Sequence, residues 1–232
     1  MTLVNAFPPA MLLGLWLNAA HTRSVSPTDA ANALEVITNQ VDLSLFSKNG
    51  SQDASWLELV QNVISAEDPV AVGLPVTGDP AGVPADVLKK ISADSGVVAI
   101  NRNQILYQDS DGVWVLINET NNVIHYDLSQ TRRNLLAQVS DAANELANSD
   151  LVGEETEVIT ALDSFQAMHI PPHLSKRSTD SIELAARIKI IAQGAIANTH
   201  AVHSPSTDRR RLQILENLIV VARSVLQSVI TT

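Results

Sequence analysis

The residues best placed to do chemistry lie in a glycine- and proline-rich stretch, residues 73–84, with the sequence GLPVTGDPAGVP. Backbone N–H groups that converge in such a loop can bind an anion, and glycines allow its close approach. Thr77, Gly78, Asp79 and Gly82 are therefore the candidate ligand residues.

The same stretch also fits a purely structural turn. It lacks the Gly-Lys-Ser/Thr of a P-loop and the glycine spacing of a dinucleotide fold, Asp79 adds a negative charge, and Pro80 removes a donor. Asp79, Pro80 and Gly82 stand at positions i, i+1 and i+3 of a predicted type I turn. The structural interpretation is favoured, and the ligand loop is the alternative.

Metal binding and catalysis have weaker candidates. His169 and His173 are four apart and His200 and His203 three apart, but a proline pair interrupts the first pair and the second is expected at a helix end. Three glutamates between residues 154 and 157 suit the first turn of a helix. No Gly-x-Ser-x-Gly elbow occurs. We therefore assign no catalytic residue, no metal and no cofactor.

Arg209, Arg210 and Arg211 open the last predicted helix, where their charges oppose the helix dipole. Either they are solvated or paired within the chain, or they contact a partner or an anionic ligand.

The helix that follows these arginines has a wide apolar face. Its apolar side chains, with Val220 as the only exception, occupy one half-circle at 100° per residue: Leu212, Ile214, Leu215, Leu218, Ile219, Val221, Ala222, Val225, Leu226, Val229 and Ile230. Its polar side chains, including Arg223, Gln227 and Ser228, take the other half. Such a face needs more than one helical partner, or a second subunit. Leu218 and Val225 join the three arginines as candidate partner contacts, and a homo-oligomer is predicted.

Charge and composition limit the partners further. The net charge is −10, and the chain has no cysteine. An acidic surface repels phosphate backbones, so we expect no nucleic-acid partner. A chain without cysteine suits a reducing cytoplasm. The apolar run from Pro8 to Ala20 precedes the first basic residue, Arg23, and is too short to span a bilayer, so it is expected to be a buried helix, and no membrane partner is predicted.

Periodicity assigns the elements. Helices are predicted over residues 10–40 as a hairpin, with Ser26 as an N-cap, and from Trp56 to a stop before Asp68-Pro69. Short strands are predicted at 41–46, 70–76, 97–100, 105–108 and 113–117, with a short helix over 84–91. The last three strands form an antiparallel meander.

Helical periodicity returns after residue 127. A helix from Leu128 carries Leu136 on its apolar face, and a shorter helix containing residues 158–165 follows. A third helix, which starts at a capping box formed by Asp180 and Glu183, buries Ile191, and a fourth starts at Pro205.

The predicted fold class is α+β: N-terminal helices on a small, mainly antiparallel sheet, followed by a C-terminal helical bundle. Residues 1–122 hold the helical hairpin and sheet, and residues 123–232 hold four helices, although both parts can share one core.

The order of these features resembles a family of uncharacterised actinobacterial proteins. The specific part is the stretch Leu-Pro-Val-x-Gly-Asp-Pro-x-Gly-x-Pro, residues 74–84. The resemblance implies no known activity and assigns no functional residue.

Two functions remain open. The first is a non-enzymatic interaction or assembly module that self-associates through its C-terminal helices. The alternative is an enzyme or small-ligand binder with a pocket at the Gly73–Pro84 loop, because strand ends carry sites in many α/β proteins.

Overall fold

A computed structural model describes residues 7–38, 41–42, 55–76, 78–91, 95–146, 170–172, 174–197 and 205–230. The chain divides into two compact units. The sheet unit comprises the described parts of Phe7–His125, His169–Ser175 and Ile230–Thr232. The helical unit comprises the described parts of Tyr126–Met168 and Lys176–Val229.

The sheet unit begins with three helices: α1 (Pro9–His21), α2 (Pro27–Ile37) and α3 (Trp56–Ser65). The Ser26 side chain accepts a hydrogen bond from the backbone of Asp29, which confirms the predicted N-cap. A capping box formed by Ser55 and Glu58 starts α3. α1 is buried along most of its length, as expected for residues 8–20.

A five-stranded sheet follows, in the order β1-β5-β4-β3-β2. Its strands are β1 (Val41–Asp42), β2 (Ala71–Gly73), β3 (Val97–Asn101), β4 (Gln104–Gln108) and β5 (Trp114–Asn118). β2 to β5 pair antiparallel, and β1 pairs parallel with β5. The predicted meander and its further member at residues 70–76 are confirmed.

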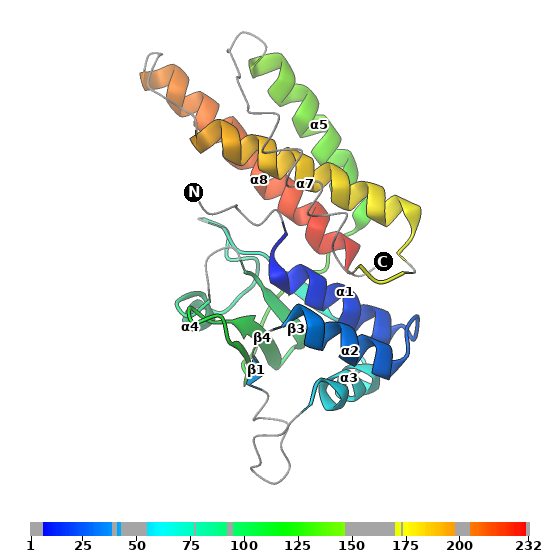
Figure 1. Cartoon of the computed structure of the whole chain (residues 1–232). Helices are drawn as coiled ribbons and strands as arrows, with labels where there is room; N and C mark the ends of the chain where they lie inside the picture. The colour runs from blue at the N-terminus through cyan, green and yellow to red at the C-terminus, as the bar shows by residue number, and fades with distance from the viewer. Residues whose placement is uncertain are drawn as a thin grey trace. The chain divides into compact units, whose positions relative to one another are not determined.

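Helices cover both faces of this sheet. α1, α2 and α3 lie on one side, and α1 lies against β2 and β3 (Figure 1). Gly14 permits this approach, since a Cβ there would overlap the side chain of Val72. The other face packs Val97, Ile105 and Tyr107 against the short helix α4 (Ala85–Leu88).

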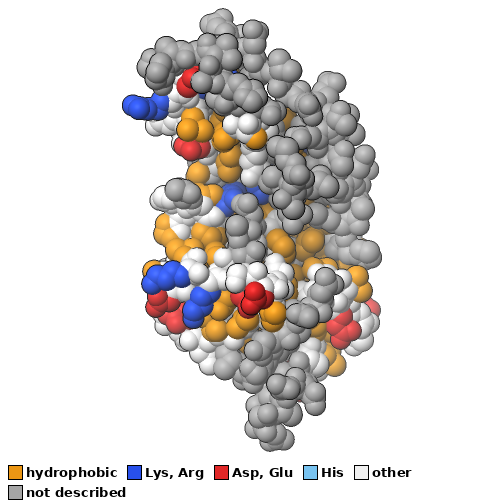
Figure 2. Space-filling model, turned by 60° about the vertical axis from the view of Figure 1, so that its left-hand side comes forward, with side chains coloured by type: hydrophobic (Ala, Val, Ile, Leu, Met, Phe, Trp, Pro, Cys, Tyr) orange, Lys and Arg blue, Asp and Glu red, His pale blue; other side chains and the backbone are white. Residues whose placement is uncertain are grey.

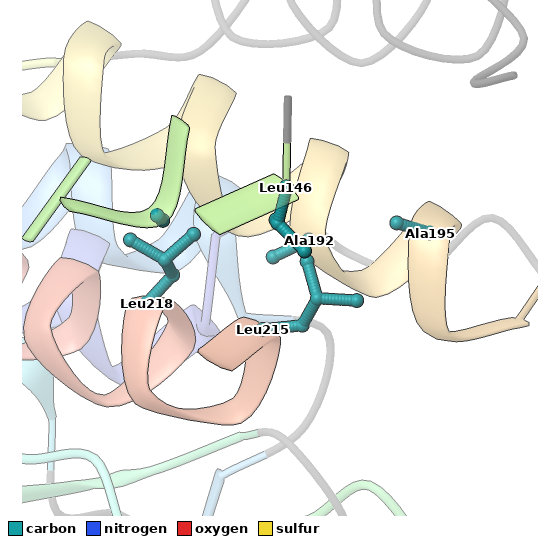
Figure 3. Close-up of a cluster of buried hydrophobic side chains, with 6 residues drawn as sticks. Leu146, Ala192, Ala195, Leu215 and Leu218 are labelled. Atoms are coloured by element: carbon teal, nitrogen blue, oxygen red, sulfur yellow. The ribbon is translucent and has the colours of Figure 1, made fainter. Parts of the chain in front are cut away.

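The helical unit contains α5 (Leu128–Leu146), α7 (Lys176–Ala197) and α8 (Pro205–Val229) among its described residues. α8 contacts both α5 and α7. Figure 3 shows Leu146, Ala192 and Leu215 meeting from the three helices in one buried cluster, which also contains Ala142, Ala195 and Leu218. The shorter helix expected at residues 158–165 lies outside the described residues.

Two expectations for α7 are wrong: the residue at which it begins, and the burial of Ile191, which is 53% exposed. Asp180 and Glu183 do not cap α7, because that helix already begins at Lys176.

The polar half of α8 is partly buried, since Arg223, Gln227 and Ser228 lie inside the protein. Ser228 accepts a hydrogen bond from the Thr131 hydroxyl at 2.9 Å, which joins α8 to α5. The α+β fold class itself is confirmed.

Candidate functional site

The candidate ligand loop is closed by its own backbone. Val76 and Asp79 exchange two backbone hydrogen bonds, each of 2.9 Å. Gly78 lies within this turn with a φ of +86°, a conformation that glycine adopts without strain. Thr77 lies outside the described residues.

The carboxylate of Asp79 has a structural partner. Its Oδ1 accepts a hydrogen bond of 2.9 Å from the backbone N–H of Ala81. Asp and Asn commonly stabilise turns in this way. The Ala81 N–H is thus already bonded and is not available to an anion. The carboxylate also places a negative charge beside the other N–H groups of the loop.

The following turn lies one residue later than predicted. Val83 donates its backbone N–H to Pro80 at 2.9 Å, so the turn runs from Pro80 to Val83. Its central residues, Ala81 and Gly82, have positive φ values of 52° and 75°. A type I turn over residues 79–82 would need a negative φ at Ala81, so that assignment is wrong; positive φ at both centres is typical of type I′.

Gly82 lies against another segment of the sheet unit. A Cβ at this position would overlap the carbonyl oxygen of Asn122, and the Asn122 N–H donates to the carbonyl of Gly82 at 3.1 Å. The glycine therefore joins the loop after β2 to the chain that follows β5. Gly78, by contrast, has no described residue within 4 Å of the point that a Cβ would occupy.

The three arginines of α8 have different surroundings. Arg209 is exposed. Arg210 donates from Nε and from Nη2 to Glu145 Oε2 of α5, both at 2.9 Å. Arg211 is half-buried, and its Nε has no hydrogen-bond partner in the described part of the chain. Since the Arg210–Glu145 pair is mostly exposed, its contribution to stability is at most about 1 kcal/mol.

Leu218 and Val225, the other candidate partner contacts, lie inside the protein. Leu218 is 9% exposed and belongs to the cluster shared by α5, α7 and α8, and Val225 is fully buried. Both side chains therefore contribute to packing within the chain.

A group of amide side chains gathers at one edge of the sheet, and we call it the amide cluster: Asn62, Asn101, Asn103, Gln104 and Asn118. Gln104 is its centre. Its Oε1 accepts from Asn101 at 2.9 Å and from Asn62 of α3 at 3.5 Å, and its Nε2 donates to Asn118 Oδ1 at 3.3 Å. These bonds fix the orientation of each amide that takes part in them.

Further hydrogen bonds fix the β3–β4 turn, which carries part of the cluster. The Asn101 side chain accepts from the backbone N–H of Asn103 at 2.8 Å. Asn121, which is 7% exposed, donates from its amide to the Asn101 carbonyl at 2.8 Å and from its backbone to Arg102 at 2.9 Å. A buried amide that makes these bonds holds the β3–β4 turn in one conformation.

The amide cluster lines a solvent-open concavity of about 520 Å³, together with Asp68 and Arg102. Arg102 Nε lies 4.0 Å from Asp68 Oδ2, and both side chains are largely exposed. The cation and the carboxylate balance each other, so the described lining carries no net charge. Its other members are neutral hydrogen-bonding groups.

Sequence patterns did not lead to this cluster, because Arg102-Asn103 is typical of an ordinary hairpin turn. A signal was nevertheless present. Asn101 follows one predicted strand, Gln104 precedes the next, and Asn118 follows the third, and an antiparallel meander brings such positions to one edge. The register pairs Gln104 with Asn101 and with Asn118.

Two groups in the described part of the chain have shifted titrations, and both lie outside the amide cluster. Burial, with the nearby charge of Asp109, raises the pKa of Tyr107 above 10.0. The hydrogen bond from Lys89 and its positive charge lower the pKa of the exposed Asp86 carboxyl. The Asp86–Lys89 pair is largely exposed, as expected for a surface ion pair.

Metal binding finds no support in the described ranges, which hold no group of three or more His, Asp or Glu side chains suited to an ion. The histidines at 169, 173, 200 and 203 and the glutamates at 154–157 lie outside those ranges. In the same ranges one stretch, Asp208–Val229, is long and apolar enough to cross a membrane, and half of its most apolar part is buried within the protein.

Comparison with known proteins identifies both halves of the chain. Residues 10–112 match the family model described as Rv1486c-like protein, N-terminal domain, and residues 129–227 match the model described as Rv1486c-like protein, C-terminal domain. No curated protein and no solved structure is similar enough to count as a match. The chain therefore contains the N-terminal and the C-terminal domain of the Rv1486c-like family, in that order.

Proposed function

We propose that the chain is a non-enzymatic interaction or assembly module that self-associates through its helical unit. One observation carries this proposal: each described helix of that unit exposes a large apolar side chain that helical periodicity assigns to its buried face. Leu136 of α5 is 45% exposed, Ile191 of α7 is 53% exposed, and Leu212 of α8 is 39% exposed.

The core of the unit supports the same proposal. Three of the six side chains in its buried cluster are alanines, and the apolar residues packed around them are only partly buried: Val139, Ile188, Ile196, Ile214 and Ile219. On the face drawn in Figure 2, apolar side chains reach the surface among charged ones. Apolar surface of this kind is stabilised when a second copy of the chain removes it from water.

The contact residues of this proposal differ from the candidate partner contacts predicted from the sequence. Leu218 and Val225 support the helical unit from within, and Arg210 is paired with Glu145. The contact residues of the proposal are therefore Leu136, Ile191 and Leu212.

Sedimentation velocity at tens of micromolar tests the proposal with the full chain. We expect the wild type to sediment as an oligomer, and Ile191→Glu and Leu136→Glu to sediment as folded monomers. Val36→Glu is the matched control, because Val36 is 69% exposed but belongs to the sheet unit. Circular dichroism of each variant reports whether it remains folded.

A monomeric wild type would end the proposal. It would also fail if Val36→Glu dissociated the protein as strongly as Ile191→Glu did. Leu218→Asp separates association from packing, since a buried carboxylate should unfold the helical unit rather than release folded monomers.

The competing candidate, an enzyme or small-ligand binder with its pocket at residues 73–84, has less support. In that loop the Asp79 carboxylate and the Gly82 backbone already make hydrogen bonds within the sheet unit. Of the three glycines, Gly73, Gly78 and Gly82, only Gly78 has open space around it among the described residues. On composition alone, we further propose a cytoplasmic protein with no nucleic-acid or membrane partner. That the family is actinobacterial and is marked by residues 74–84 also stays a prediction.

A further inference from the structure

We infer that the concavity lined by the amide cluster binds a neutral, polyhydroxylated small molecule, that is, a carbohydrate. The site lies wholly in the sheet unit. It is independent of the self-association proposed for the helical unit.

The chemistry of the lining selects the ligand class. An amide group both donates and accepts hydrogen bonds, and so does each hydroxyl group of a sugar. Five amides line one concavity. Arg102, the one cation among the described lining residues, stands beside the carboxylate of Asp68, which disfavours an anion such as phosphate. None of the described lining residues is hydrophobic, which disfavours an apolar ligand.

The geometry leaves hydrogen-bonding capacity directed to the ligand. Asn101 and Gln104 are occupied with the internal bonds of the cluster. Within the described part of the chain, the side-chain amide of Asn103 makes no hydrogen bond, and the side chain of Asn118 accepts one through Oδ1 but donates none through Nδ2. Asn103 and Asn118 are also exposed. They are the ligand-binding groups, and Asn101, Gln104 and Asn121 are positioning residues.

The size of the concavity agrees with this class. About 520 Å³ lies within the usual range of roughly 300–1,000 Å³ for small-molecule sites. Because internal hydrogen bonds fix Asn101, Gln104 and Asn118, a ligand need not order these three side chains on binding.

Titration of the ¹⁵N-labelled full chain, followed through its side-chain amide resonances, tests the inference. The neutral probes are glucose, galactose, mannose and maltose, and the charged probes are inorganic phosphate and glucose 6-phosphate. Local chemical shifts are needed because sugars are excluded from protein surfaces and stabilise most proteins without binding. We expect at least one neutral sugar to shift the Asn103 and Asn118 resonances saturably.

Two variants and a control complete the test. Asn118→Ala and Asn103→Ala should each weaken that binding about three- to ten-fold, the loss expected for one hydrogen bond. Asn32→Ala removes an exposed amide on α2, outside the concavity, and should leave it unchanged. The inference is overturned if no neutral sugar shifts the cluster, if a charged probe binds more tightly than every neutral one, or if both cluster variants bind as wild type.

Discussion

Replacement of Gly82 by alanine measures directly whether the glycine loop is a structural joint. At a φ of +75° an alanine is strained by about 1–2 kcal/mol. Its Cβ would also overlap the Asn122 carbonyl oxygen, well inside the 3.4 Å at which ordinary contact begins. The obstacle is backbone, so the hydrogen bond from Asn122 to Gly82 would have to yield, at a further cost of about 0.5–1.5 kcal/mol.

Gly78→Ala is the matched control within the same loop. Gly78 has a similar φ of +86°, but within the described ranges no atom lies within 4 Å of the position that its Cβ would take. Only the backbone strain applies there, and it is offset by about 0.4–1 kcal/mol because alanine also restricts the unfolded chain. The same offset applies at Gly82, so we expect Gly78→Ala to lower the free energy of unfolding by about 1 kcal/mol and Gly82→Ala by about 2 kcal/mol.

Urea unfolding followed by tryptophan fluorescence gives the two values. Trp16, Trp56 and Trp114 are the only tryptophans, and all are buried in the sheet unit, so the signal reports on the unit that contains the loop. Equal destabilisation by the two substitutions would refute the reasoning, because it would mean that Gly82 does not lie against residue 122.

Three further predictions concern other elements. Ser26→Ala should lower the free energy of unfolding of the sheet unit by about 1 kcal/mol in the same assay, because it removes the N-cap of α2. Tyr107 should keep its proton above pH 10.0 in an absorbance titration, and the stability that this shift contributes should be complete below pH 10.0 and lost as the pH rises through the folded pKa; Tyr107→Phe should abolish both effects. Leu218→Ala should destabilise the helical unit by about 2–4 kcal/mol by circular dichroism, and Leu212→Ala by less than about 1 kcal/mol.

The sheet unit could be predicted well because its signals are local. The alternating strands at 97–118 are separated by short turns, and a strand that ends in a tight turn has only one neighbour it can pair with. Ser26 and Pro27 likewise fix the start of α2 without help from distant residues. The parallel pairing of β1 with β5 joins segments more than 70 residues apart in the sequence, and local patterns carry no information on it.

The helical unit shows where periodicity stops being informative. Lys189 is fully buried on α7 while Ile191, two residues later, is 53% exposed. A helix that packs against neighbours on more than one side is not buried along a single face. Its apolar periodicity therefore does not show which side chains each neighbour buries. The start of α7 was misplaced for a related reason, because an Asp-x-x-Glu spacing can also occur inside a helix.

The candidate sites divide in the same way. The composition of residues 73–84 correctly predicted a turn but not the residues at which it lies. The turn has positive φ at Ala81 and Gly82, and Gly82 lies against Asn122, a contact that the local sequence does not show. Predicting the amide cluster would require the strand register and the position of Asn62 of α3 beside Gln104. Local sequence patterns do not give the position of a helix relative to a sheet.

The sequence therefore pointed to the glycine-rich loop as the candidate site, whereas the structure favours the amide cluster. In the glycine-rich loop, the groups that could bind a ligand already make hydrogen bonds within the chain. The Asp79 carboxylate accepts from the Ala81 N–H, and the Gly82 carbonyl accepts from the Asn122 N–H. The hairpin turn that looked ordinary carries exposed amide side chains at the concavity. A binding site differs from a structural turn because some of its hydrogen-bonding groups have no partner within the chain. In the described part of the sheet unit the side-chain amides of Asn103 and Asn118 have such groups, and the Asn118 amide is also oriented by Gln104.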